Sequence, residues 1–140
     1  MKKIVVIDGQ GGKLGQMLIE QINSRQVECE VFAVGTNSIA TANMLKSGAD
    51  YGATGENPVV VNCRDADVIV GPIGIAVADS LLGEVTAAMS VAVGQSSAEK
   101  ILLPINRCST YVVGTQNLSV ADLVAQAVEL IQKMLDISSK

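Results

Sequence analysis

Glycines near the start of the sequence are the first residues whose types and spacing could do chemistry. They follow a short apolar run, Ile4–Ile7, and precede a helical pattern that begins at Leu14. Glycines let the chain turn sharply and let a ligand approach the main chain, while the free N–H groups and positive dipole end of a helix favour phosphate. The pattern predicts an anion site built from backbone, against the alternative of a tight turn that binds nothing. Its candidate residues are Asp8, Gly9, Gln10, Gly11 and Gly12.

Further candidates follow three other predicted strands. Open α/β sheets bind ligands at the carboxyl ends of their strands, in a crevice where the strand order reverses. Thr36 and Asn37 could hydrogen-bond a ribose or a base edge there, or merely cap the helix that follows them. The candidate residues at these strand ends are Thr36, Asn37, Thr54, Glu56, Gly71, Ile73 and Gly74.

Two acids on this face, Asp8 and Glu56, offer the remaining chemistry. Both are expected at carboxyl ends of parallel strands, at the same mouth of the sheet and close enough to share a ligand, a water or a metal. Two converging acids could bind a metal or act in general acid–base catalysis. Alternatively, Asp8 accepts hydrogen bonds from the glycine turn; its charge would repel a pyrophosphate there. Asp79 is expected one turn into a helix after Gly74, where it could form a subunit contact.

Other kinds of catalytic site lack essential residues. Neither Tyr51 nor Tyr111 has a lysine four residues later, so the tyrosine–lysine pair of short-chain dehydrogenases is missing. No acid that would bind an adenosine ribose ends the second predicted strand. Lys13 is followed by Leu14, which leaves a P-loop without its magnesium-binding hydroxyl. Standard NAD or NADP recognition is therefore not expected, and the sequence identifies no cofactor.

The thiols are poor candidates for catalysis or metal binding. The chain contains no histidine that could activate a cysteine or bind zinc. Three widely spaced cysteines fit reduced thiols better than a disulfide framework. Arg107 could lower the pKa of the neighbouring Cys108, although an inert packing residue is the alternative. The three cysteines are Cys29, Cys63 and Cys108.

Composition limits the partners. The chain has 140 residues, of which 49% are hydrophobic and 2% aromatic, and its net charge is −4. Few aromatic rings and a negative charge argue against binding of nucleic acid. No segment has the charge-free length of a membrane span, and the start of the chain is too polar for a signal peptide, so we expect a cytoplasmic protein. Its mean hydropathy of +0.39 is explained most simply by burial between subunits of a homo-oligomer.

The length of the chain indicates a single domain, residues 1–140. The order of the predicted strands and helices indicates a Rossmann-like three-layer α/β sandwich with a mostly parallel sheet. The helix capped by Thr86 is apolar on all sides and must be buried, against another subunit or under the chain's own loops. After the last parallel strand, a short turn before Thr110–Val113 predicts an antiparallel edge strand. Strands are also predicted at Ile4–Ile7, Glu30–Val34, Asp67–Val70 and Lys100–Ile105, and helices at Leu14–Ser24, Ser38–Leu45, Ala87–Val93 and after Ser119.

The segment from Asp50 to Arg64 admits two interpretations. Val59–Val61 looks like a strand, but it lies too close to the next strand for a parallel crossover. Asn57 and Pro58 form a favourable helix start, so we prefer a helix at Pro58–Arg64 and a short third strand at Asp50–Ala53. The alternative is a surface hairpin, which would move Glu56 away from the site.

The chain also resembles known families. The spacing Gly9-x-x-Gly12-x-x-Gly15 resembles the glycine pattern of extended short-chain dehydrogenases and their non-catalytic, NADP-sensing relatives. A longer resemblance rests on Ile7–Gly12, Gly35–Asn37, Gly48–Asp50, Ala53–Asn57, Gly71–Gly74 and Ala78–Glu84. Through these segments the whole chain is similar to a small uncharacterised bacterial family, known mainly from anaerobic Gram-positive organisms and catalogued only as a domain of unknown function. This resemblance implies a Rossmann-like fold and brings no activity.

Three functional hypotheses remain. The leading one is a non-redox protein that binds a nucleotide or another phosphorylated small molecule at the strand-end glycine turns. The second is a small enzyme, a transferase or hydrolase, that uses Asp8 and Glu56. The third is a structural oligomer with a vestigial pocket.

Overall fold

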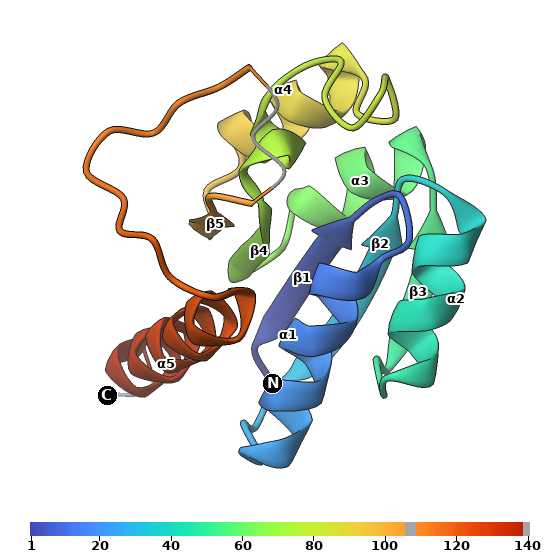
Figure 1. Cartoon of the computed structure of the whole chain (residues 1–140). Helices are drawn as coiled ribbons and strands as arrows, with labels where there is room; N and C mark the ends of the chain where they lie inside the picture. Colours follow the sequence, from blue (N-terminus) through green and yellow to red (C-terminus); the bar gives the residue numbers. More distant parts are fainter. Residues whose placement is uncertain (106–108, 139–140) are drawn as a thin grey trace.

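Five parallel strands form one sheet in the computed structural model of the chain, which describes residues 1–105 and 109–138. Their spatial order is β3-β2-β1-β4-β5, so β1 lies at the centre (Figure 1). This is the order of a doubly wound, Rossmann-like sheet whose switch point lies between β1 and β4. The strands are β1 (Lys3–Asp8), β2 (Glu30–Gly35), β3 (Tyr51–Thr54), β4 (Val68–Pro72) and β5 (Glu99–Leu103).

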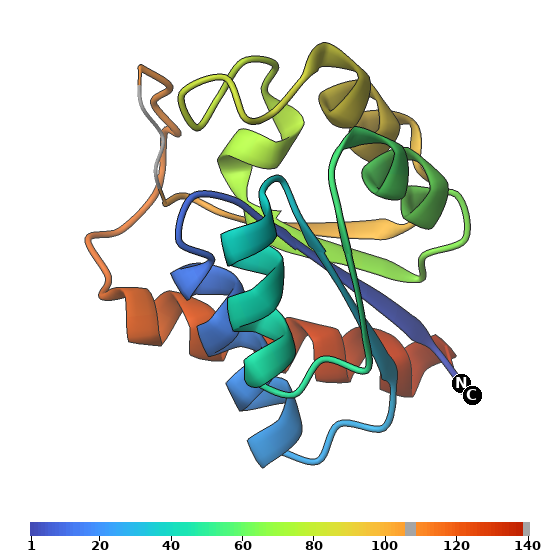
Figure 2. The same ribbon diagram turned by 90° about the vertical axis from the view of Figure 1, so that its right-hand side faces the viewer.

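Helices cover both faces of the sheet and make the predicted three layers. One face carries α1, α2 and α5, and the other carries α3 and α4 (Figure 2). The helices are α1 (Lys13–Ser24), α2 (Ser38–Lys46), α3 (Glu56–Cys63), α4 (Ala87–Gln95) and α5 (Val120–Ser138), with a short 3₁₀ helix, η1 (Ile73–Ala76), after β4.

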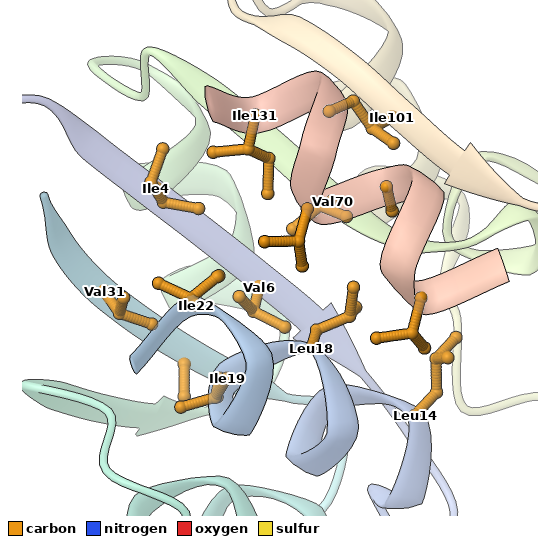
Figure 3. Close-up of a cluster of buried hydrophobic side chains, with 14 of the residues drawn as sticks. Ile4, Val6, Leu14, Leu18, Ile19, Ile22, Val31, Val70, Ile101 and Ile131 are labelled. Carbon is orange, nitrogen blue, oxygen red and sulfur yellow. The ribbon is translucent and has the colours of Figure 1, made fainter. Parts of the chain in front are cut away.

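Two hydrophobic cores explain why β1 is an unbroken apolar run. Successive side chains of a strand point to opposite faces, so a strand covered on both sides needs apolar residues throughout. Ile4 and Val6 pack with Leu18 of α1 and Ile131 of α5 (Figure 3). Val5 belongs to the second core, with α3 and α4. The central strand is thereby fixed between the layers, and its carboxyl end is held in place.

The preferred interpretation of the third strand is confirmed. Tyr51–Thr54 pairs in parallel with β2, and the valines that follow lie in α3. The helix begins earlier than predicted, at Glu56, because its N-cap is Gly55 and not Asn57. Gly55 has a φ of +107°, a conformation that glycine adopts without steric cost. Glu56 therefore stands in the first turn of α3, at the carboxyl edge of the sheet.

The predicted antiparallel edge strand is wrong. β5 is the edge strand on that side and runs parallel to β4. Thr110–Val113 is irregular and lies in the long connection to α5 (Figure 1). Its apolar side chains have no face to bury, since Tyr111 is 88% and Val113 98% exposed. Strand propensity reflects the fit to a partly buried, pleated surface, which this segment does not have. The turn predicted at Asn106–Ser109 cannot be compared in full, because residues 106–108, Cys108 among them, lie outside the described residues.

The predicted helix after Gly74 is also wrong. The chain makes only the 3₁₀ turn η1 and then an irregular segment, residues 77–86, which we call the 77–86 loop. Asp79, Leu81 and Leu82 have φ values of +66°, +56° and +56°. An α-helix cannot contain such residues, because left-handed backbone points the chain out of the helical path. Asp79 thus lies on an exposed loop and not one turn into a helix.

The apolar helix α4 is confirmed, with Thr86 as its N-cap. Within the single chain it buries only Met89 and Val93, and Val91 remains 50% exposed. The expectation that the whole helix is covered is therefore not met by the chain's own loops. No helix within the described ranges has the length and hydrophobicity needed to cross a membrane.

Candidate functional site

The predicted glycine turn joins β1 to α1 and is held in one conformation by several hydrogen bonds. The Gly12 amide donates to the Gly9 carbonyl over 2.9 Å, and Gly12 has a φ of +72°. A Cβ on Gly12 would lie 2.7 Å from the Ala40 backbone of α2, so only glycine fits there. Side chains of Asn37 and Asn43 donate to the carbonyls of Gln10 and Gly11, each over 2.8 Å. The turn is therefore preorganised by its neighbours.

Asp8 is buried and hydrogen-bonded to the glycine turn and the start of α1. The side chain is 2% exposed, and its oxygens accept the amides of Gly9 at 2.8 Å and Gly15 at 2.7 Å. Burial raises the pKa of Asp8, the two amides oppose that rise, and the nearby Glu84 charge adds to it. The carboxylate caps amides at the start of α1 that would otherwise be available to an anion. The alternative interpretation, in which Asp8 accepts hydrogen bonds from the turn, is thus the one that the structure bears out.

Another acidic residue, Glu84, lies at the carboxyl ends of β1 and β2, among residues that the sequence predicts to bind a ligand. Its Oε1 atom accepts the Gln10 amide at 2.8 Å, the Thr36 hydroxyl at 2.6 Å and the Asn37 side-chain amide at 2.8 Å. These donors come from the glycine turn and from the segment after β2, so they belong to two loops that the parallel sheet brings together. Three donors that meet at one anionic oxygen form an anion site.

The surroundings of Glu84 keep its carboxylate ionised. Partial burial raises its pKa, but the hydrogen bonds from Thr36, Gln10 and Asn37 together outweigh this effect. The pKa of Glu84 consequently lies below its usual value, because donors stabilise the charged form more than burial disfavours it. The three donors therefore bind a charged carboxylate rather than a neutral acid.

Leu81 packs against Gly9 beside Glu84. It is 2% exposed, although its neighbour Leu82 is 94% exposed. A Cβ on Gly9 would meet Leu81 at 2.8 Å and Glu84 at 2.9 Å, and a Cβ on Gly74 would meet the Leu81 side chain at 3.8 Å. The 77–86 loop therefore packs directly over the first glycine turn and over the turn after β4.

The other predicted site residues have mainly structural contacts. Thr54 shares a hydrogen bond of 2.7 Å with the Thr41 hydroxyl. Gly71 is required because a Cβ there would collide with the Ile7 carbonyl of β1. Ile73 opens η1 and Gly74 is buried beneath the 77–86 loop. Glu56 is exposed at the same edge of the sheet as Asp8, but β2 lies between their strands.

Thiol and metal chemistry find little support in the described ranges. Burial raises the pKa of Cys29 and of Cys63 to about 11, so neither is a ready nucleophile. Among residues 1–105 and 109–138, no group of three or more cysteine or acidic side chains is arranged to hold a metal ion. Cys108 lies outside these ranges, so the choice between a thiol activated by Arg107 and an inert packing residue stays untested.

Sequence reasoning missed Glu84 and Leu81. Both lie between Gly74, after which an apolar helix is predicted, and Thr86, which is predicted to cap the next helix, and neither is among the candidate site residues. The only sequence signal is that Ala78–Glu84 is one of the segments on which the resemblance to an uncharacterised bacterial family rests. That signal marks the segment but gives no role to the carboxylate.

Comparisons with known proteins find one matching family and similar solved structures. A family model described as a domain of unknown function, DUF3842, matches residues 3–136. No curated protein matches the chain in sequence. One similar solved structure is a dodecameric FMN-dependent Ubix-like decarboxylase from Escherichia coli O157:H7, with 16% identity, 100% of this chain and 95% of that chain covered, and a TM-score of 0.45. Another is an arsenate reductase in the phosphate-binding state, with 21% identity, 97% and 98% covered, and a TM-score of 0.46. Likeness at this level carries no conclusion about the site.

Proposed function

Because the chain belongs to the family of the domain of unknown function DUF3842, which supplies no activity, we propose its function from the geometry of the site. The protein binds a nucleotide or another phosphorylated small molecule, without redox chemistry, at the carboxyl ends of β1 and β2. The contacts that hold the ligand's phosphate are the Gln10 amide, the Thr36 hydroxyl and the Asn37 side-chain amide.

The observation that carries this proposal is the meeting of these three donors at one anionic oxygen, 2.6–2.8 Å away. A phosphate oxygen accepts the same hydrogen bonds as a carboxylate oxygen, and charge-assisted bonds of this kind are about twice as strong as neutral ones. The site also lies beside the switch point of the sheet, where open α/β folds bind their ligands.

The two-acid enzyme has weaker support. Asp8 is buried and both of its oxygens accept backbone amides, so it is not positioned to take a proton from a ligand. Glu56 alone supplies no pair of converging acids. A binding function needs only the donors described above.

The test is a titration of the full chain followed by NMR, which suits a protein of 14.5 kDa. Inorganic phosphate, ribose 5-phosphate and AMP serve as separate probes, so that a general phosphate site is distinguished from one that needs a ribose or a base. We expect each binding probe to shift the amides of Gln10, Gly11 and Thr36. Gly48, which precedes β3 and so lies at the opposite edge of the parallel sheet, serves as the control. Shifts confined to another region, or none with any probe, would contradict the proposal.

A further inference from the structure

We propose that Glu84 is an internal competitor of the ligand: its carboxylate occupies the anion position of the site, and a phosphate group enters only when the 77–86 loop lifts. This inference rests on the proposed function and adds its regulation. It also limits the chemical class of the ligand, because the group that replaces Glu84 must itself be an anionic oxygen acceptor, as in a phosphate monoester.

While Glu84 keeps its contacts, a phosphate group cannot accept hydrogen bonds from the same three donors. One oxygen uses the Gln10 amide, the Thr36 hydroxyl and the Asn37 side-chain amide together. The same loop brings Leu81 against Gly9, where a ligand would have to approach the main chain. A phosphate at these donors would thus meet both an occupied acceptor position and a negative charge.

The 77–86 loop has the features of an element with two positions. Three residues other than glycine, Asp79, Leu81 and Leu82, hold left-handed backbone, and Gly83 has a φ of +88°. Such strained conformations persist only when surrounding contacts fix them, and they are common in clamps and switches. The loop is flanked by defined ends, the 3₁₀ turn η1 and the N-cap Thr86. Loss of the Glu84 contacts would let the strained backbone relax.

A different role for Glu84 would leave it in place. Its carboxylate could stay bound to the three donors and accept hydroxyl groups of a ligand. It could also have no role other than to hold the 77–86 loop against the glycine turn. Competition, fastening and hydroxyl recognition differ in the sign of the change in affinity when Glu84 is replaced, and this difference defines the test.

The first experiment compares the affinities of wild type, Glu84→Ala, Glu84→Gln and Asp79→Asn for inorganic phosphate, ribose 5-phosphate and AMP by calorimetry. Removal of the competitor raises the fraction of sites that are open, so we expect Glu84→Ala to bind the phosphate probes about tenfold more tightly or better. Glu84→Gln keeps the shape, weakens the charge-assisted bonds and should lie in between. Asp79→Asn removes the same charge from the same loop and should change affinity less than about twofold.

The second experiment follows hydrogen exchange of the 77–86 loop in the wild-type protein. The amides of Glu84 and Val85 donate to the carbonyls of Leu81 and Ser80 within the loop. A phosphate probe that displaces Glu84 should accelerate the exchange of these amides, and Glu84→Ala should have the same effect without a ligand. Protection of these amides by the probe would overturn the inference.

The outcomes also separate this inference from the proposed function. Equal phosphate affinity of wild type and Glu84→Ala overturns the competition but leaves the binding function. Weaker AMP binding by Glu84→Ala, with unchanged binding of inorganic phosphate, overturns it in favour of hydroxyl recognition. Tighter binding by Asp79→Asn and Glu84→Ala to the same extent would reduce the effect to net charge and overturn it as well. No binding of any probe to wild type or to folded Glu84 variants removes both proposals.

Discussion

Two carboxylates at the carboxyl end of β1, Asp8 and Glu84, differ in role because their surroundings differ. Asp8 is enclosed and bonded to the backbone of its own turn, so burial raises its pKa. Glu84 is only partly buried and accepts three donors from other segments, which lower its pKa. The first belongs to the framework of the glycine turn, while the second is the residue that we propose to compete with a ligand.

Asp8→Asn tests the structural role of the buried acid. The amide nitrogen of asparagine would face one of the two N–H donors of Gly9 and Gly15, so one buried donor loses its acceptor. We expect the free energy of unfolding to fall by about 2 kcal/mol, measured by urea denaturation. Asp65→Asn is the matched control: Asp65 is 72% exposed and pairs with Lys3 at 2.7 Å, and exposed pairs contribute less than about 1 kcal/mol. Equal effects of the two substitutions would contradict the role given to Asp8.

The lowered pKa of Glu84 predicts how the stability of the protein depends on pH. A carboxyl group whose pKa is lower in the folded than in the unfolded state stabilises the protein above its unfolded pKa, and this contribution is lost as the pH falls through the folded value. The ordinary value for Glu84 is 4.5, and its folded pKa lies below that. Wild type should therefore be more stable than Glu84→Gln near neutral pH, and the difference should shrink as the pH falls below 4.5. Unfolding curves of both proteins across this range provide the measurement, and a constant difference would count against it.

At the scale of elements, the sequence predicted the parts whose signals are local. The strand at β2, the cap of α2 by Asn37 and the start of α5 at Ser119 follow from periodicity and capping preferences. The choice of a helix over Val59–Val61 was correct because a parallel crossover needs more residues than a strand there would leave. These rules need only a few neighbouring residues.

The parts that the sequence did not predict depend on distant contacts. Glu84 donors lie 74 and 47 positions away, at Gln10 and Asn37. The left-handed residues of the 77–86 loop carry no sequence signal for that conformation. Hydrogen bonds within the loop and the packing of Leu81 against Gly9 hold it. Tyr111 and Val113 have strand-forming side chains but no surface to cover.

Replacement of a glycine by alanine should have opposite effects on stability in β4 and in α4. Gly71 in β4 faces the Ile7 carbonyl so closely that a Cβ cannot fit, and Gly71→Ala should cost at least about 2 kcal/mol. Gly94 in α4 has nothing within 4 Å of a built Cβ and an ordinary helical position. Gly94→Ala should stabilise by about 0.5–1 kcal/mol, because alanine loses less backbone entropy on folding. Thermal or chemical unfolding of the pair measures both signs, and a stabilising Gly71→Ala would contradict the packing described for β4.

At the scale of the whole molecule, the exposed apolar side of α4 predicts a homo-oligomer. Val91 is 50% exposed on a helix with few polar residues, and such apolar surface is commonly covered by a second copy. We expect at least a dimer for wild type and a monomer for Val91→Asp, measured by light scattering over a concentration series. Leu130→Asp, at a residue that is 44% exposed on α5, should leave the mass unchanged. A monomeric wild type at every concentration would refute the prediction.

The central position of β1 has a consequence for the order of events during synthesis. β1 leaves the ribosome before either neighbouring strand. One of its edges pairs only after β2 has emerged and the other only after β4, since Lys3 pairs with Glu30 and Ile4 with Val68. Until β4 emerges, one edge of an apolar strand has no partner, and unpaired apolar edges promote aggregation. Parallel pairing over such distances is also slow. Nascent chains that end between β2 and β4 should therefore be the ones that most need protection by chaperones.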